Sequence, residues 1–188
     1  MASLRIRVQH APRPRSDDPD AADDEHLGSW LSSLVRDAVE KGKAGPVAVV
    51  VRGEHVDLVA LHPDGRPPPL GVHGFLSGLT ASTRDGDRAE IVGVVGRFVA
   101  RRGPGDRTGS PVALVFLEWP DCRWWFWRMV LDAEGRPLVD GEQVTSAAAG
   151  DPMPAGLGRW WSTQRRTGAV VSFGERLPDE IPVAPHVH

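Results

Sequence analysis

The stretch VALVFLEWPDCRWWFWRMVL, residues 112–131, predicts two strands joined by a tight turn. Residues 112–119 and 122–131 are both strongly apolar and rich in β-branched and aromatic side chains, which is typical of strands. Pro120 and Asp121, which stand between them, are residues that favour turns. Strands joined by so short a connection pair antiparallel. The stretch therefore favours a mostly antiparallel sheet.

Further strands are expected on both sides of this hairpin. Valine-rich or alternating runs predict them at residues 4–9, 46–52, 56–61, 91–100 and 169–173. The segment 140–158 is rich in small residues and is typical of a loop. The segments at residues 4–9 and 169–173 are the short candidates at the two ends, and the sheet as a whole is predicted to hold five or six strands.

One long helix is expected before most of these strands. Apolar residues recur there at intervals of three and four and form one continuous stripe: Leu27, Trp30, Leu31, Leu34, Val35, Ala38 and Val39. Two shorter helical turns are predicted at residues 75–79 and 159–164. Because only one long helix is predicted, the expected fold class is α+β: a mostly antiparallel sheet of five to six strands with this amphipathic helix packed on one face.

The chain is expected to divide into one domain and two flanking segments. Residues 1–25 combine a strand-like segment with a charged linker rich in Pro and Asp. Residues 26–177 form the single α+β domain, and residues 178–188 form an extended C-terminal tail.

The composition argues against several classes of function. The 22 basic and 25 acidic residues give a net charge of −3, so there is no excess of positive charge for nucleic acid or an anionic membrane. The single cysteine, Cys122, excludes an internal disulfide and a cysteine-based zinc site. No apolar run approaches the roughly 18 residues of a membrane-spanning helix, and the N-terminus lacks a secretory apolar core. We therefore expect a cytoplasmic protein with no nucleic-acid or membrane partner.

The residue usage points to a GC-rich and therefore bacterial genome. The chain has no Asn and no Tyr, and Arg far outnumbers Lys. The glycines of the Arg-rich loop at residues 101–107 could let backbone amides approach an anion, but an exposed loop encoded by such a genome explains it equally well. No cofactor is expected.

Tryptophan gives the strongest local signal, since the chain holds seven Trp. In the strand at residues 122–131, Trp125 and Trp127 share one face while Trp124 and Phe126 share the other. One interpretation is a central strand that is covered on both sides. The other is an exposed aromatic face that binds a partner. The residues of that candidate surface are Trp119, Trp125, Trp127, Trp160, Trp161 and Arg123.

A second candidate site begins with His55 and Asp57, which stand two residues apart in a predicted strand and share a face. A histidine beside a carboxylate is the arrangement of an oriented general base or of a metal-ligand pair. A third group would be needed, and His62, His73 and Glu118 are the candidates. A polar outer face of a hairpin explains the same two residues, and no metal site is predicted.

These patterns favour a non-enzymatic module that binds a protein or peptide partner, as a component of a bacterial protein assembly, through the Trp-rich sheet surface. One alternative is a small metal-dependent or His/Asp-based hydrolase that uses His55 and Asp57. A third hypothesis is a small-molecule binding protein with its pocket between the helix and the sheet, lined by Trp30 and strand aromatics. The partner, the ligand and the oligomeric state are left open by the sequence.

Overall fold

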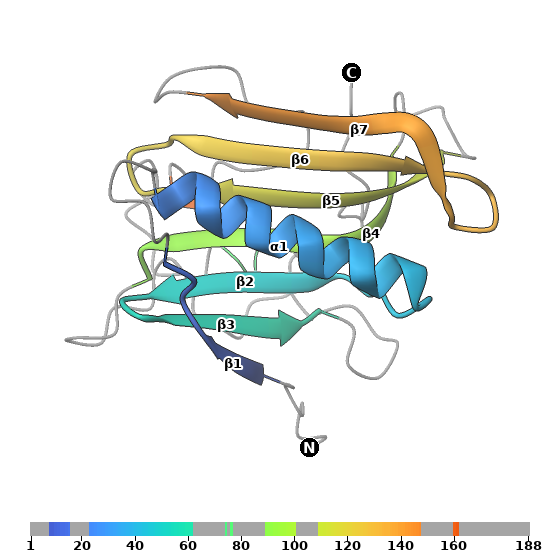
Figure 1. The fold of residues 1–188 in the computed structure, drawn as a ribbon. Coiled ribbons are helices and arrows are strands. Elements are labelled where there is room, and N and C mark those ends of the chain that lie inside the picture. Colours follow the sequence, from blue (N-terminus) through green and yellow to red (C-terminus); the bar gives the residue numbers. More distant parts are fainter. Residues whose placement is uncertain are drawn as a thin grey trace.

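Seven strands and one long helix make up the part of the chain that the structure describes (Figure 1). The computed structural model describes residues 8–15, 23–61, 74, 76, 89–100, 109–147 and 160–161. In chain order the elements are β1 (Val8–Pro12), α1 (Asp23–Glu40), β2 (Val47–Arg52), β3 (His55–Ala60), β4 (Ile91–Ala100), β5 (Ser110–Glu118), β6 (Trp124–Leu131) and β7 (Pro137–Ala147). All neighbouring strands pair antiparallel in the order β1-β3-β2-β4-β5-β6-β7. The predicted α+β class with a mostly antiparallel sheet is confirmed.

The sheet has seven strands rather than the expected five or six. The additional strand is β7, which pairs with β6 alone and therefore forms an edge of the sheet. Its sequence, PLVDGEQVTSA, lacks the alternation of apolar and polar residues that marks a half-buried strand. Residues 140–147 are consequently strand and not loop. The strand expected at residues 169–173 lies outside the described residues.

The first strand lies further along the chain than the prediction of residues 4–9. β1 pairs with β3 from Val8, opposite Val59, to Pro12, opposite His55. Proline is compatible with this position because an edge strand pairs on one side only. Residues 11–12, which were expected to belong to the linker, are therefore part of the sheet.

Helix α1 begins at Asp23 and has the predicted buried face. The residues of the apolar stripe that are buried against the sheet are Leu27, Leu31, Val35 and Val39. Trp30 and Ala38 are only partly buried, and the side chain of Leu34 is 39% exposed. The stripe is therefore wider than the surface that the sheet covers.

The C-terminus of α1 is closed by a Schellman motif, as the Gly at position 42 predicts. Gly42 has a φ of 64°, and its N–H donates a hydrogen bond to the carbonyl of Val39 at 2.9 Å. The N–H of Lys43 donates to the carbonyl of Ala38 at 2.8 Å. This turn redirects the chain from α1 into β2.

Apolar side chains cover the sheet on both faces. α1 lies across one face and contacts β4, β5 and β6, with β3 and β1 to one side of the helix (Figure 1). The core on the α1 face includes Val49, Val115, Leu117, Trp125 and Trp127. The core on the opposite face includes Val50, Val92, Leu114, Phe116, Phe126 and Trp160. The sheet is thus the middle layer of the described part of the chain.

Several expected features lie outside the described residues. They are the linker at residues 16–22, His62, His73, the loop at residues 101–107 and the tail at residues 178–188. Of the two short helical turns, the structure describes positions 74, 76, 160 and 161, and these are helical. No helix in the described ranges is both long and apolar enough to cross a membrane.

A polar contact ties α1 to the edge of the sheet and makes stability depend on pH. Trp127 Nε1 donates to Glu142 Oε1 at 2.6 Å, and the guanidinium of Arg36 donates to the same oxygen. These two hydrogen bonds, chiefly the one from Trp127, hold the pKa of Glu142 below its ordinary value of 4.5. Because the pKa is lower in the folded state, the ionised carboxylate stabilises the fold above about pH 4.5, and this contribution is lost as the pH falls through the lowered pKa.

We therefore expect Glu142→Gln to be less stable than the wild type at pH 7, by under about 1 kcal/mol because Glu142 is half-exposed. The difference in the free energy of unfolding should shrink as the pH is lowered below 4.5, since the wild-type carboxyl then becomes neutral as well. Urea unfolding of both proteins from pH 7 to pH 3 measures this difference. A difference that does not change with pH would contradict the assignment.

Candidate functional site

The tryptophans of β6 are buried on both faces of the sheet. On the α1 face, Trp125 is 5% exposed and Trp127 is 1% exposed, while Trp124 on the opposite face is 6% exposed. The sequence leaves two interpretations of this strand open, and the structure supports the first: β6 is covered on both faces. The expected surface of exposed indole rings is not found at these positions, because α1 covers one face and Trp160 and Trp161 lie in the core of the other.

Trp119, Trp160 and Trp161 also lie in the core, with 7%, 2% and 4% of their surface exposed. The ring of Phe116 stacks on Trp124 with centroids 6.1 Å apart and meets Trp160 edge-on with centroids 5.4 Å apart. The chain thus returns to the tryptophan strand, as the binding hypothesis requires, but the contact is internal packing.

A buried carboxylate holds Trp160 and Trp161 in place. Glu118, the last residue of β5, is fully buried, and its Oε2 accepts a hydrogen bond from the backbone N–H of Trp160 at 2.9 Å. Trp161 Nε1 donates to the backbone carbonyl of Glu118 at 3.1 Å. Glu118 therefore anchors residues 160 and 161 on the sheet.

Arg123 is the exposed member of the proposed binding residues. Its Nε donates to Asp121 Oδ2 at 2.7 Å, and its guanidinium lies 5.4 Å from the centre of the Trp119 ring. Partial burial raises the pKa of the Asp121 carboxyl, but the hydrogen bonds from the side chain and the backbone N–H of Arg123 outweigh this effect and hold the pKa below its ordinary value. Arg123 thus closes the turn between β5 and β6, next to Cys122, whose φ is 69°.

The second candidate site is arranged differently from the expected pair of His55 and Asp57. Asp57 Oδ1 lies 2.6 Å from His10 Nδ1, and Asp57 Oδ2 accepts a hydrogen bond from Arg52 Nη1 at 2.6 Å. Both carboxylate oxygens are therefore used by residues other than His55. Since an ionised carboxylate only accepts hydrogen bonds, His10 Nδ1 is the donor in this contact.

The contact between His10 and Asp57 is not among the expected ones, because His10 lies past the end of the predicted first strand. The register of β1 against β3 places His10 directly opposite Asp57. The side chain of His10 is 73% exposed. The pair is an oriented imidazole on the sheet surface, and Arg52 neutralises the same carboxylate.

Glu118 does not complete a site with Asp57. The sheet register aligns Asp57, Val50, Val92 and Glu118 in one row across four neighbouring strands. Three strand spacings, about 14 Å, separate the backbones of Asp57 and Glu118. Among the residues that the structure describes, no group of three or more His, Cys, Asp or Glu is arranged to hold a metal ion.

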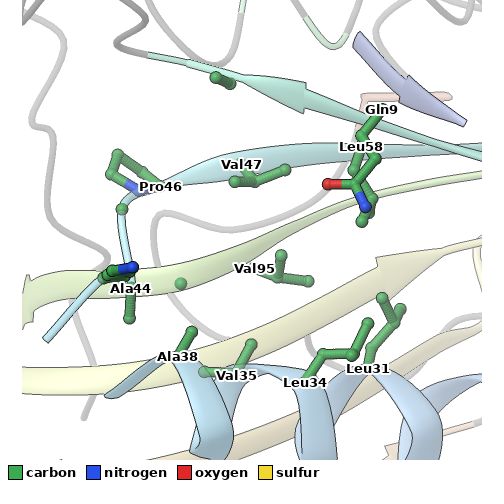
Figure 2. Close-up of a pocket in the computed structure, with 14 residues that line it drawn as sticks. Gln9, Leu31, Leu34, Val35, Ala38, Ala44, Pro46, Val47, Leu58 and Val95 are labelled. Atoms are coloured by element: carbon green, nitrogen blue, oxygen red, sulfur yellow. The ribbon is translucent and has the colours of Figure 1, made fainter. Parts of the chain in front are cut away.

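A groove with a volume of about 530 Å³ lies between α1 and the sheet. We call it the α1 groove, and its lining residues are Gln9, Leu31, Leu34, Val35, Ala38, Lys43, Ala44, Gly45, Pro46, Val47, Leu58, Ala60, Val95 and Gly96. Figure 2 shows Leu31, Leu34 and Val35 of α1 pointing toward the strands across the space. The groove thus has the helix as one wall, β2 and β4 as its floor, and β3 and β1 as the opposite wall.

The floor of the α1 groove depends on a close approach of two backbone segments. Gly96 has a φ of 122°, and a Cβ at this position would lie 2.1 Å from the carbonyl oxygen of Gly45. Any larger residue at position 96 would therefore displace the turn between α1 and β2, which forms the end of the groove. The turn is also tied to β4 by a hydrogen bond from the Arg97 N–H to the Ala44 carbonyl at 3.2 Å.

The chemistry of the α1 groove is aliphatic with a small polar rim. Of the lining residues, only Gln9 and Lys43 have polar side chains, and both are exposed. The third hypothesis placed a pocket between the helix and the sheet, and the α1 groove lies there. It is not lined by Trp30 or by strand aromatics, because those rings lie in the core or beside it.

No family model matches this chain, and neither a curated protein nor a solved structure matches it.

Proposed function

We propose that this chain is a non-enzymatic protein-binding module whose recognition site is the α1 groove, and that apolar side chains of a partner protein occupy the groove. The observation that carries the proposal is the aliphatic cavity of about 530 Å³ between α1 and the sheet. Because the tryptophans are buried, we propose this groove, and not the Trp-rich surface, as the recognition site.

The lining favours a protein segment over a small molecule. Sites for small molecules combine an apolar cavity with several convergent polar groups that fix the orientation of the ligand. The α1 groove offers two polar side chains, Gln9 and Lys43, and both are exposed at its rim. An apolar centre with a polar rim is instead the usual anatomy of a protein interface.

Leu34 marks the open side of this site. Its side chain belongs to the apolar stripe of α1, lines the groove and is 39% exposed. Burial of such a leucine by a partner removes apolar surface from water and stabilises the complex. Leu138 on β7 is 47% exposed and is not among the lining residues, which makes it a matched control.

Leu34→Glu is expected to weaken binding of the natural partner at least tenfold, because a charged side chain would be desolvated in an apolar site. The partner is first isolated with the wild-type chain from its own cells and identified. Its dissociation constant is then measured by titration calorimetry with purified wild type, Leu34→Glu and Leu138→Glu.

Leu138→Glu should bind like the wild type, and thermal unfolding should show that both variants fold. Equal affinity of all three proteins for the partner would exclude the α1 groove as the recognition site. Loss of binding in both variants would also contradict the proposal, since the effect would then follow surface charge and not position.

A further inference from the structure

We infer that the partner segment in the α1 groove is an amphipathic α-helix that runs antiparallel to α1 and places an acidic residue of its first turn beside Lys43. This inference rests on the proposed function and names the form and chemistry of the partner. Three observations support it: the floor strands of the groove are already paired on both sides, the helical wall has the length of a short helical contact, and a lysine lies at one end.

The backbone of the groove floor and of the turn at its end already has hydrogen-bond partners. The carbonyls of Ala44 and Pro46 already accept hydrogen bonds from the N–H groups of Arg97 and Leu61, at 3.2 and 3.0 Å. The floor is formed by β2 and β4, which pair with each other inside the sheet. An extended peptide buried here would leave its own N–H and C=O groups unpaired, which is costly in an apolar site. A helix satisfies these groups internally.

The wall of the groove has the length of a short helical contact. The α1 side chains that line it run from Leu31 to Ala38, which spans about 10 Å along the helix axis. A partner helix packed alongside would present apolar residues at i, i+3 or i+4, and i+7 over the same distance. Figure 2 shows the α1 side chains facing Val47, Val95 and Leu58 across the space that such a stripe would fill.

Charge gives the direction of the partner helix. Lys43 follows the C-terminus of α1, is exposed, and forms no ion pair with a described residue. Acidic residues are favourable in the first turn of a helix, where they interact with the positive end of its dipole. An antiparallel partner brings its first turn to the C-terminal end of α1, so its acidic residue meets Lys43.

The test is a selection on the full chain with a display library of helical peptides, in which the apolar stripe and the first turn are randomised. We expect the enriched peptides to share an apolar stripe and a first-turn Asp or Glu. Lys43→Glu should weaken the binding of these peptides at least tenfold. A peptide that carries Lys in place of its first-turn Asp or Glu should bind the Lys43→Glu variant more tightly than the original peptide does. Lys41→Glu is the matched control, because Lys41 is exposed nearby but does not line the groove.

Several outcomes would overturn the inference. They are enrichment of peptides that tolerate proline within the stripe, equal effects of Lys43→Glu and Lys41→Glu, a dimer of the chain that depends on Leu34, or tight binding of decanoate with no peptide enriched. If Leu34→Glu weakens the natural partner while no helical peptide is enriched, the helix is excluded and protein binding in the groove stands. If peptides bind but Leu34→Glu has no effect on them or on the partner, the proposed function fails as well.

Discussion

Trp127→Ala is expected to lower the free energy of unfolding by about 3–5 kcal/mol, the usual cost of truncating a buried tryptophan. Trp127 is 1% exposed and lies on the α1 face of the sheet. The guanidinium of Arg36 lies 5.3 Å from the centre of the Trp127 ring, and Trp127 Nε1 donates a hydrogen bond to Glu142. The substitution therefore removes a large apolar volume and the donor that joins β6 to β7. Urea or thermal unfolding of the purified variant measures the loss.

Val144→Ala is the matched control for this prediction. Val144 lies directly opposite Trp127 on β7, on the same face of the sheet, but its side chain is 58% exposed. Its truncation should change the free energy of unfolding by less than about 0.5 kcal/mol. If Trp127→Ala unfolds like the wild type, the ring is not part of the core, and the exposed aromatic surface regains support.

Gly28→Ala is expected to destabilise the fold by about 1–3 kcal/mol, although alanine favours a helix more than glycine does. A Cβ at position 28 would lie 2.6 Å from two atoms of the Trp125 ring, which is itself buried. Neither the ring nor α1 can move without loss of packing, so the clash outweighs the gain of about 1 kcal/mol in helix propensity.

Ser29→Ala separates this clash from a general effect on the helix. Ser29 is exposed and follows Gly28 directly, so its replacement should be neutral or slightly stabilising. Equilibrium unfolding of the two variants gives the comparison. A Gly28→Ala protein more stable than the wild type would show that α1 does not approach Trp125 this closely.

The interior of the sheet was predictable from the sequence, whereas its edges were not. The strands at 112–119 and 122–131 correspond to β5 and β6, because strands buried on both faces carry continuous apolar runs. β7 at the edge pairs on one side only, and its polar residues resemble a loop. The contact between His10 and Asp57 depends on the register of β1 against β3, which local patterns do not encode.

The α1 groove was less predictable, although one signal pointed to it. The apolar stripe of α1 includes Trp30, Leu34 and Ala38 in addition to the residues that the sheet buries. A stripe wider than a single contact indicates that the helix has a second neighbour. The sequence does not show where that contact ends, since this depends on which strands lie under α1. The abundance of tryptophan was equally compatible with a buried and an exposed strand, and only the covering layers decide between them.

The central claim is that the α1 groove holds a segment of a partner protein, and site-specific photocrosslinking in the source cells tests it most directly. A photoreactive amino acid is placed at position 34 in one version of the chain and at position 138 in a second. We expect position 34 to crosslink to one contiguous partner segment, in competition with excess unlabelled wild type, and position 138 to give no such product. Equal crosslinking from both positions, or none from position 34 while the partner still copurifies, would contradict the claim.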